Sequence, residues 1–204
     1  MSARRTILLL IGLALYGLSL SLLVRANLGL APWDVFHQGV AKVTGLSLGT
    51  VIVGTSFVVL TLWIPLGQRP GVGTFANAVL VGVGVDAFSA VLPDIDGTVA
   101  RWLLLIAGVV LNGVATGLYI GAGMGPGPRD GLMTGIARRG HPIRVVRTSL
   151  ELAVLIAGIA LGGSFGVGTI AYALGIGPLV HIFLPWFTRL GDGGRSTAIA
   201  AAPA

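Results

Sequence analysis

The chain repeats part of its own sequence at an offset of 96 residues, and this repeat limits what it can fold into. The matched positions are Ala26, Gly29, Pro32, Asp34, Gly39, Ala41 and Lys42 in the first copy, and Ala122, Gly125, Pro128, Asp130, Gly135, Ala137 and Arg138 in the second. A Gly-Val-Gly-Thr motif also occurs in both copies, at 71–74 and at 166–169. Each copy contains three long apolar stretches. Because three is odd, two copies in one membrane must have opposite orientations, and inverted repeats of this kind build many transporters.

The composition indicates a membrane protein independently of the repeat. The chain is 54% hydrophobic and 10% charged, whereas a soluble domain carries about 25% charged residues. Six stretches approach the length of about 20 residues that spans a bilayer core: 7–24, 49–66, 74–92, 100–120, 145–163 and 170–188. We therefore expect an all-α membrane protein of six transmembrane helices, arranged as two inverted three-helix repeats, about 4–92 and 100–188. Residues 1–190 would form one polytopic domain, and 191–204 a flexible C-terminal tail.

The basic residues predict the orientation of this domain. With the amino terminus in the cytoplasm, the cytoplasmic side would receive Arg4, Arg5, Arg69, Arg129, Arg138, Arg139, Arg144, Arg147, Arg189 and Arg195. The outer side would receive Arg25, Lys42 and Arg101. Basic residues are enriched in cytoplasmic loops of membrane proteins. This asymmetry predicts a multi-pass protein of the bacterial cytoplasmic membrane, with both termini in the cytoplasm.

Several function classes have no support in the sequence. The net charge is +6, but the basic residues are not interleaved with aromatic ones and no nucleic-acid recognition motif is present. The chain has no cysteine, which excludes disulfides and thiolate metal sites. It also lacks a Ser-His-Asp set, a His-x-x-x-His zinc pair and paired catalytic carboxylates. We expect no enzyme activity, no metal, no cofactor and no nucleic-acid partner.

A short helix is predicted after the first span of each repeat. Pro32 and Pro128 suit the first turn of a helix, and Asp34 and Asp130 follow each proline by two residues, where a carboxylate complements the positive helix end. The predicted helices, 32–43 and 128–139, are too short to cross a membrane. Each either lies in the interface as an amphipathic helix or enters the membrane and returns. In the second case, the glycines before each helix, Gly29 and Gly125 among them, would supply the non-helical backbone.

Polar residues at membrane depth are the candidates for a solute or ion pathway. A charge at the bilayer centre costs about 2.5–3.5 kcal/mol on insertion scales, so each one needs a partner or a function. Asp86 lies in the third span, and His181 lies at the matching repeat position in the sixth. Such a pair could form a proton relay or an ion site, or each could form a hydrogen bond that only fixes packing. Transport predicts that both face one wet cavity. Asp34, Asp130 and His37, one turn after Asp34, are the further pathway candidates.

Other polar residues are better explained by packing. Glu151 follows Arg147 by four residues, the spacing of a helical ion pair. Asn112 in the fourth span can bridge neighbouring helices through hydrogen bonds. Glycines spaced by four, such as Gly113 and Gly117, let helices approach closely, and the same stripes would serve a homodimer or another membrane protein equally well.

Two motifs resemble a known family. Residues 26–34 (ANLGLAPWD) followed by 45–49 (GLSLG), and residues 121–133 (GAGMGPGPRDGLM), are similar to the two signatures of the YczE/YyaS/YitT group of small bacterial membrane proteins, with the YczE-like branch as the best match. The resemblance covers nearly the whole chain. It implies a multi-pass plasma-membrane protein of a bacterium, without a reaction or substrate, because the family has no firmly assigned biochemical activity.

These features favour a transporter or channel-like protein for a small polar or ionic solute, driven by a proton or another ion and working by rocking of one half against the other. The alternative is an accessory protein that scaffolds another membrane or biosynthetic complex without transporting anything. A transporter needs a wet cavity between its halves. An accessory protein would be a dry, closed bundle with a groove for its partner.

Overall fold

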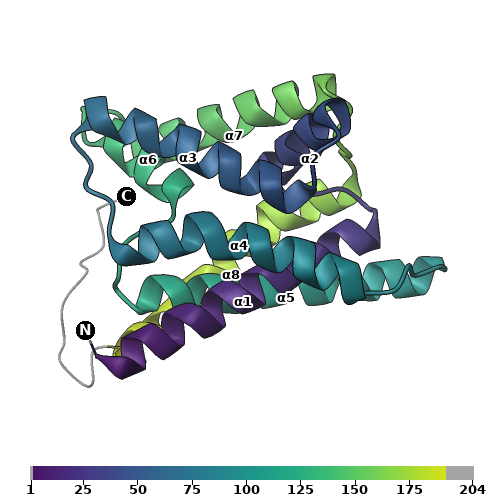
Figure 1. The fold of residues 1–204 in the computed structure, drawn as a ribbon, viewed down its shortest axis with the longest axis horizontal. Helices are drawn as coiled ribbons and strands as arrows, with labels where there is room; N and C mark the ends of the chain where they lie inside the picture. The colour runs from purple at the N-terminus through teal and green to yellow at the C-terminus, as the bar shows by residue number, and fades with distance from the viewer. Residues whose placement is uncertain (1, 192–204) are drawn as a thin grey trace.

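The computed structural model describes residues 2–191, and every regular element in that range is an α-helix. The helices are α1 (Ala3–Ala26), α2 (Pro32–Thr44), α3 (Leu48–Leu66), α4 (Val72–Val91), α5 (Thr98–Gly121), α6 (Pro128–Ala137), α7 (Ile143–Ala160) and α8 (Val167–Gly191). Figure 1 shows them as a bundle with nearly parallel and antiparallel axes. The predicted all-helical class is confirmed. Residues 192–204, which hold Arg195 and nearly all of the predicted tail, lie outside the described range.

The helix boundaries follow from the local sequence. The six predicted spans correspond to α1, α3, α4, α5, α7 and α8, and the two short helices begin at Pro32 and Pro128 as predicted. Proline is tolerated at these first positions because its missing N–H would have no partner there. Ser47 begins α3 by accepting a hydrogen bond from the Thr50 N–H at 3.1 Å. Gly45 and Gly67 end α2 and α3 in the left-handed conformation that glycine adopts without strain.

Within residues 2–191, five helices are long and apolar enough to cross a membrane: α1, α3, α4, α5 and α8. The exception among the six predicted spans is α7, which has 18 residues but carries Arg144, Arg147 and Glu151. On the five, large apolar side chains such as Phe57, Ile106 and Leu174 are exposed. A soluble protein would cover such side chains. In a multi-pass membrane protein they contact the lipid bilayer.

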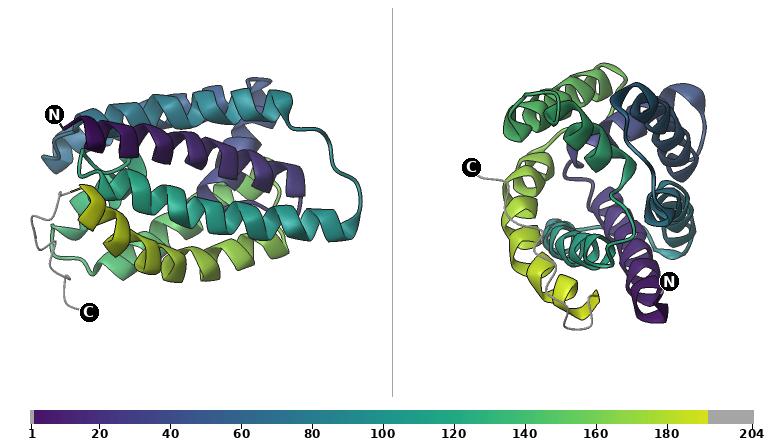
Figure 2. Two further views of the ribbon diagram at one scale, coloured as in Figure 1. Left: turned by 90° about the horizontal axis from the view of Figure 1, so that it is seen from below. Right: turned by 90° about the vertical axis from the view of Figure 1, so that its left-hand side faces the viewer.

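Helices α1, α4, α5 and α8 form one layer, and the other four described helices cover it (Figures 1 and 2). Helix α1 packs along α5 at the centre, with α4 on the far side of α1 and α8 on the far side of α5. Small residues allow these close contacts, because a Cβ on Gly12 would lie 2.7 Å from the Tyr119 backbone nitrogen. The second layer contains α3, which packs on α4, together with α2, α6 and α7.

The two short helices are held inside the second layer. Their apolar residues form a core cluster with α3 and α7 that contains Trp33, Val59, Trp63, Leu132, Met133 and Val146. Trp63 is 2% exposed, and its indole N–H donates to the Pro128 carbonyl at 3.0 Å, at the very start of α6. In α2, the residues from Pro32 to Val35 are all buried. The amino-terminal ends of α2 and α6 are therefore inside the protein.

The repeated Gly-Val-Gly-Thr motif fixes the loop that precedes each short helix. At the start of α4, the Gly73 N–H donates to the Met124 carbonyl at 2.8 Å; at the start of α8, the Gly168 N–H donates to the Leu28 carbonyl at 2.7 Å. Each motif thus binds the loop that belongs to the other copy of the repeat. The backbones approach so closely that a side chain at Gly71 or Gly166 would collide with these loops.

Candidate functional site

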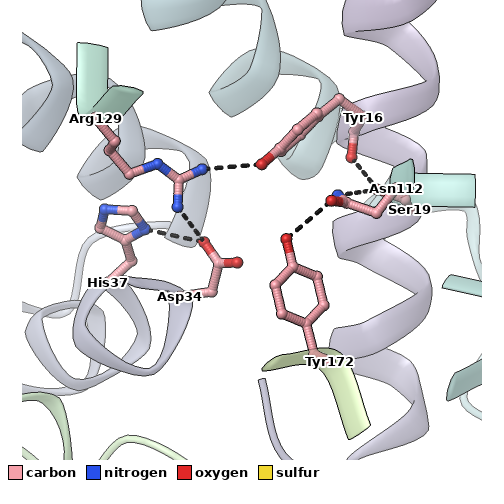
Figure 3. Close-up of polar contacts among 7 residues, drawn as sticks. All are labelled: Tyr16, Ser19, Asp34, His37, Asn112, Arg129 and Tyr172. Carbon is pink, nitrogen blue, oxygen red and sulfur yellow. Dashed lines mark hydrogen bonds and ion pairs between the residues drawn. The ribbon is translucent and has the colours of Figure 1, made fainter. Parts of the chain in front are cut away.

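A cluster of polar side chains lies where the amino-terminal ends of α2 and α6 meet the middle of α1 (Figure 3). Arg129, in the first turn of α6, donates from Nη2 to the Tyr16 hydroxyl at 3.2 Å. Its Nη1 lies 3.9 Å from Asp34 Oδ1, in the first turn of α2. The same guanidinium stacks over the Trp33 ring, 5.8 Å from the centroid, an arrangement that stabilises a cation by its attraction to the aromatic face.

Asp34 also contacts the imidazole of His37 behind the cluster. Asp34 Oδ1 lies 3.2 Å from His37 Nδ1, and both residues are buried. Among residues 2–191, Asp34 Oδ2, His37 Nε2 and the Trp33 indole nitrogen have no hydrogen-bond partner.

The carboxylate of α6 has its own partner. Asp130 Oδ2 accepts a hydrogen bond from the Tyr119 hydroxyl of α5 at 2.5 Å. The Tyr119 ring packs edge-on against Tyr16, with centroids 6.0 Å apart. Asp130 therefore contacts this pair of tyrosines directly, whereas Asp34 is linked to it through Arg129.

Asn112 joins three of the helices beneath this cluster. It is fully buried in α5, donates to Ser19 Oγ of α1 at 2.8 Å and accepts from the Tyr172 hydroxyl of α8 at 2.9 Å (Figure 3). The bridging role predicted for Asn112 is consistent with these bonds. They also orient the Tyr172 ring toward the cluster.

We predict that Asn112→Ala destabilises the fold by about 1–2 kcal/mol, because it leaves the Ser19 and Tyr172 hydroxyls without this partner. Thermal unfolding of the purified protein in detergent measures the change. Thr61→Ala is the control, since the Thr61 hydroxyl bonds only to the preceding turn of its own helix, at Val58. Equal stability of the two variants would contradict the bridging role.

A cavity of about 200 Å³ opens beside the cluster. Its wall includes Tyr16, Trp33, Tyr119, Arg129, Asp130 and Tyr172. On the side of α7 it is lined by Arg147 and Glu151, and on the side of α8 by residues from Tyr172 to Val180. Helix α7 packs against α2 and α6 and has at most slight contact with α8 within the described range. The cavity therefore reaches outward between α7 and α8.

Comparison with known proteins places the chain in a family. Residues 3–185 match a family of unknown function, DUF6198. The chain belongs to this family. It is 38% identical over 183 residues to an uncharacterized protein of Haemophilus influenzae, covering 89% of this chain and 84% of that protein. It is 35% identical over 194 residues to the uncharacterized membrane protein YczE of Bacillus subtilis, covering 92% and 89%.

The second Bacillus subtilis relative is the uncharacterized protein YyaS, which is 26% identical over 186 residues and covers 88% of this chain and 92% of its own length. The resemblance to the YczE and YyaS proteins is confirmed by these matches. No solved structure matches the chain. The site of this DUF6198 member must therefore be interpreted from its own geometry.

The structure separates the predicted pathway residues of the DUF6198 chain into two groups. Asp34, Asp130 and His37 belong to the central cluster, and Asp130 lines the cavity. Asp86 and His181 do not meet there, so the shared cavity predicted for these two residues is not found within residues 2–191. His181 is exposed on α8, and among the described residues neither it nor Asp86 lines the cavity.

Asp86 instead joins α4 to the start of α3. Its Oδ2 accepts from Ser47 Oγ at 2.6 Å and its Oδ1 accepts from the Gly49 N–H at 2.8 Å. A carboxylate is stabilised at this place by the positive end of the helix. Helices α3 and α4 are also closely packed here, because a Cβ on Gly82 of α4 would lie 2.5 Å from the Gly49 carbonyl oxygen of α3.

The predicted structural residues occupy distinct places. Arg147 and Glu151 form the expected ion pair at 2.8 Å, and both also line the cavity. Gly29 and Gly125 lie in the loops before the short helices with φ of +111° and +121°, and Pro32 and Pro128 begin those helices. Within residues 2–191, no three His, Asp or Glu side chains gather in a way that would hold a metal ion.

Sequence reasoning missed the centre of the site. The distribution of basic residues predicts a cytoplasmic loop position for Arg129, but the structure encloses it between α1 and α2. Tyr16, Tyr119 and Tyr172 were not singled out. One signal was available: Arg129 occupies the repeat position that Trp33 occupies in the first copy, so a charge stands at a helix start where its counterpart is aromatic.

Proposed function

We propose that this protein is a membrane transporter for a small polar or ionic solute, which binds in the cavity beside Arg129. The observation that carries the proposal is that charged and aromatic groups from both copies of the repeat line one cavity beside the middle of α1 and α8. The amino-terminal ends of two short helices meet at this place, which is the arrangement of solute sites in transporters with broken helices.

Two inverted halves of three spans are part of this proposal. The packing supports them, because the partners correspond: α1 contacts α4 as α5 contacts α8, and α2 contacts α7 as α6 contacts α3. The paired Gly73–Met124 and Gly168–Leu28 hydrogen bonds have the same correspondence. In this arrangement α7 is the counterpart of α3 and forms the sixth crossing, its charges directed to the cavity by the Arg147–Glu151 pair.

We also infer that α2 and α6 are re-entrant and not interfacial. Their amino-terminal residues are buried near the middle of α1 and the last turn of α5, whereas their carboxyl-terminal ends, near Lys42 and Arg138, are exposed. Non-helical backbone at membrane depth is tolerated where protein surrounds it, and the loops before both helices meet that condition through the Gly-Val-Gly-Thr contacts.

One asymmetry supports rocking of the halves. Asp86 closes the α3–α4 contact, whereas its repeat counterpart His181 is exposed and the corresponding helices α7 and α8 have little contact. Figure 2 shows the start of α7 and the end of α8 far apart at the end that carries the amino terminus. If that end is cytoplasmic, as its arginines favour, the cavity is open to the cytoplasm and closed to the outside.

Site-directed labelling tests this proposal without knowledge of the solute. The chain has no native cysteine, so Thr116→Cys places a single thiol in the cavity wall. We expect a membrane-impermeant maleimide to modify it in both right-side-out and inside-out vesicles, because a transporter exposes its cavity to each side in turn. The matched control, Leu46→Cys in the exposed α2–α3 loop, should react from one side only. Modification of the cavity thiol from a single side, or from neither, would contradict transport and favour an accessory role.

A further inference from the structure

We propose that the solute carries a carboxylate and that Arg129 binds it; this inference rests on the proposed transport function and names the class of its substrate. The argument depends on which charged groups in the cavity already have close partners. Among the described residues, four charged ones line the cavity: Arg129, Arg147, Asp130 and Glu151.

Three of these four groups are engaged. Arg147 Nε donates to Glu151 Oε1 at 2.8 Å, which occupies one cation with one anion. Asp130 accepts from the Tyr119 hydroxyl at 2.5 Å. Glu151 is therefore neutralised by Arg147, and one oxygen of Asp130 is occupied by the Tyr119 hydroxyl.

The guanidinium of Arg129 can donate more hydrogen bonds than it does in the described structure. A guanidinium carries five N–H donors in a rigid fork, yet within the described residues its one hydrogen bond is to Tyr16. The nearest carboxylate oxygen, Asp34 Oδ1, is 3.9 Å away, beyond hydrogen-bond distance. The side chain is 26% exposed, although it lies inside the bundle, because it forms part of the cavity wall.

The surroundings prepare this guanidinium for a planar anion. Trp33 stacks against one face of it and Tyr16 holds one nitrogen, so that its plane is fixed before a ligand arrives. A carboxylate accepts two parallel hydrogen bonds from such a fork. Phosphate could do the same, but a second negative charge would be repelled by Asp34, Asp130 and Glu151 around the cavity. The volume of about 200 Å³ restricts the ligand to a small molecule.

Equilibrium binding to the intact protein in lipid nanodiscs tests the proposal. The probes are L-lactate and L-alanine with their amides, lactamide and alaninamide, and inorganic phosphate. We expect at least one of the two acids to bind, as measured by calorimetry, and its amide to bind about tenfold more weakly or not at all. Comparison of lactate with alanine shows whether the solute also needs an ammonium group. Equal binding of acid and amide, binding of neither acid, or tighter binding of phosphate would overturn the assignment.

Variants locate the carboxylate. Arg129→Gln and Arg129→Lys should both weaken binding of the acid by about tenfold or more, the lysine because it keeps the charge and loses the planar fork. The control Arg138→Gln removes a cation just beyond the other end of α6, outside the cavity, where its guanidinium bonds to Gln68 at 3.4 Å, and it should leave binding within about twofold. If Arg129→Gln binds the acid with unchanged affinity, Arg129 does not bind the carboxylate. Because the acid and amide are compared on the unaltered chain, a variant that fails to fold does not prevent a decision.

The two proposals fail separately. Carboxylate binding without labelling of Thr116→Cys from both sides would leave a binding site and remove transport. Labelling from both sides in a protein that does not distinguish acid from amide would leave transport and remove the carboxylate.

Discussion

Alanine in place of Gly29 is expected to destabilise the fold by about 2–5 kcal/mol. This loss is a large part of the free energy of unfolding of a typical protein, about 5–15 kcal/mol. Two effects combine. Gly29 has a φ of +111°, a conformation that a residue with a side chain rarely adopts. A Cβ there would also lie 2.6 Å from the Gly166 backbone nitrogen and 2.7 Å from Thr169 Oγ1, where no flexible side chain can move away.

Gly125 provides an independent repetition of this test. Its φ is +121°, and a Cβ would lie 2.7 Å from Thr74 Oγ1. The matched control is Gly123→Ala in the same loop, where φ is +65° but nothing lies within 4 Å, so only the backbone strain of about 1–2 kcal/mol applies. Detergent size-exclusion profiles and thermal unfolding report the losses. If Gly29→Ala and Gly125→Ala unfold no earlier than Gly123→Ala, the two loops do not pack on α4 and α8 as described.

Removal of the Asp86 carboxylate is expected to open the α3–α4 side of the protein. Asp86→Ala deletes two hydrogen bonds to the start of α3, one from Ser47 and one from Gly49. Hydrogen bonds to a charged group contribute about 1.5–3 kcal/mol each, so the population of a state open between α3 and α4 should rise by about tenfold or more. The reaction rate of Thr116→Cys with an impermeant maleimide from the outside should increase accordingly.

The control for this experiment is Asp94→Asn. Asp94 is a carboxylate just beyond the same end of α4, but it pairs with Arg25 and is almost fully exposed. It does not touch α3 in that pairing, and such exposed pairs contribute little. Equal labelling rates of Thr116→Cys with and without Asp86→Ala would show that Asp86 only contacts the start of α3 and controls no gate.

The sequence predicts where the helices begin, but it does not predict which side chains from distant helices lie close together. Pro32 with Asp34, and Pro128 with Asp130, predict the starts of the short helices, because the lack of an N–H and the charge near the helix end act within a few residues of the chain. Asp86 and His181 show the opposite case. Their matched repeat positions favoured a shared site, but whether two side chains meet depends on how α4 and α8 pack, and these helices lie on opposite sides of the α1–α5 pair.

The sequence by itself determined that this is a helical membrane protein and that part of its sequence is repeated. The length of an apolar stretch and the residues that begin a helix are local properties of the sequence. Only the tertiary structure decided where the polar groups meet. Arg129, Tyr16 and Asp34 come from three helices that are separated by up to 113 residues, and nothing in their local sequence encodes a common centre. Close backbone contacts at the glycines of α1, α4, α5 and α8 bring these segments together. That packing places the Arg129 guanidinium, which donates one hydrogen bond within the described residues, in the wall of a cavity.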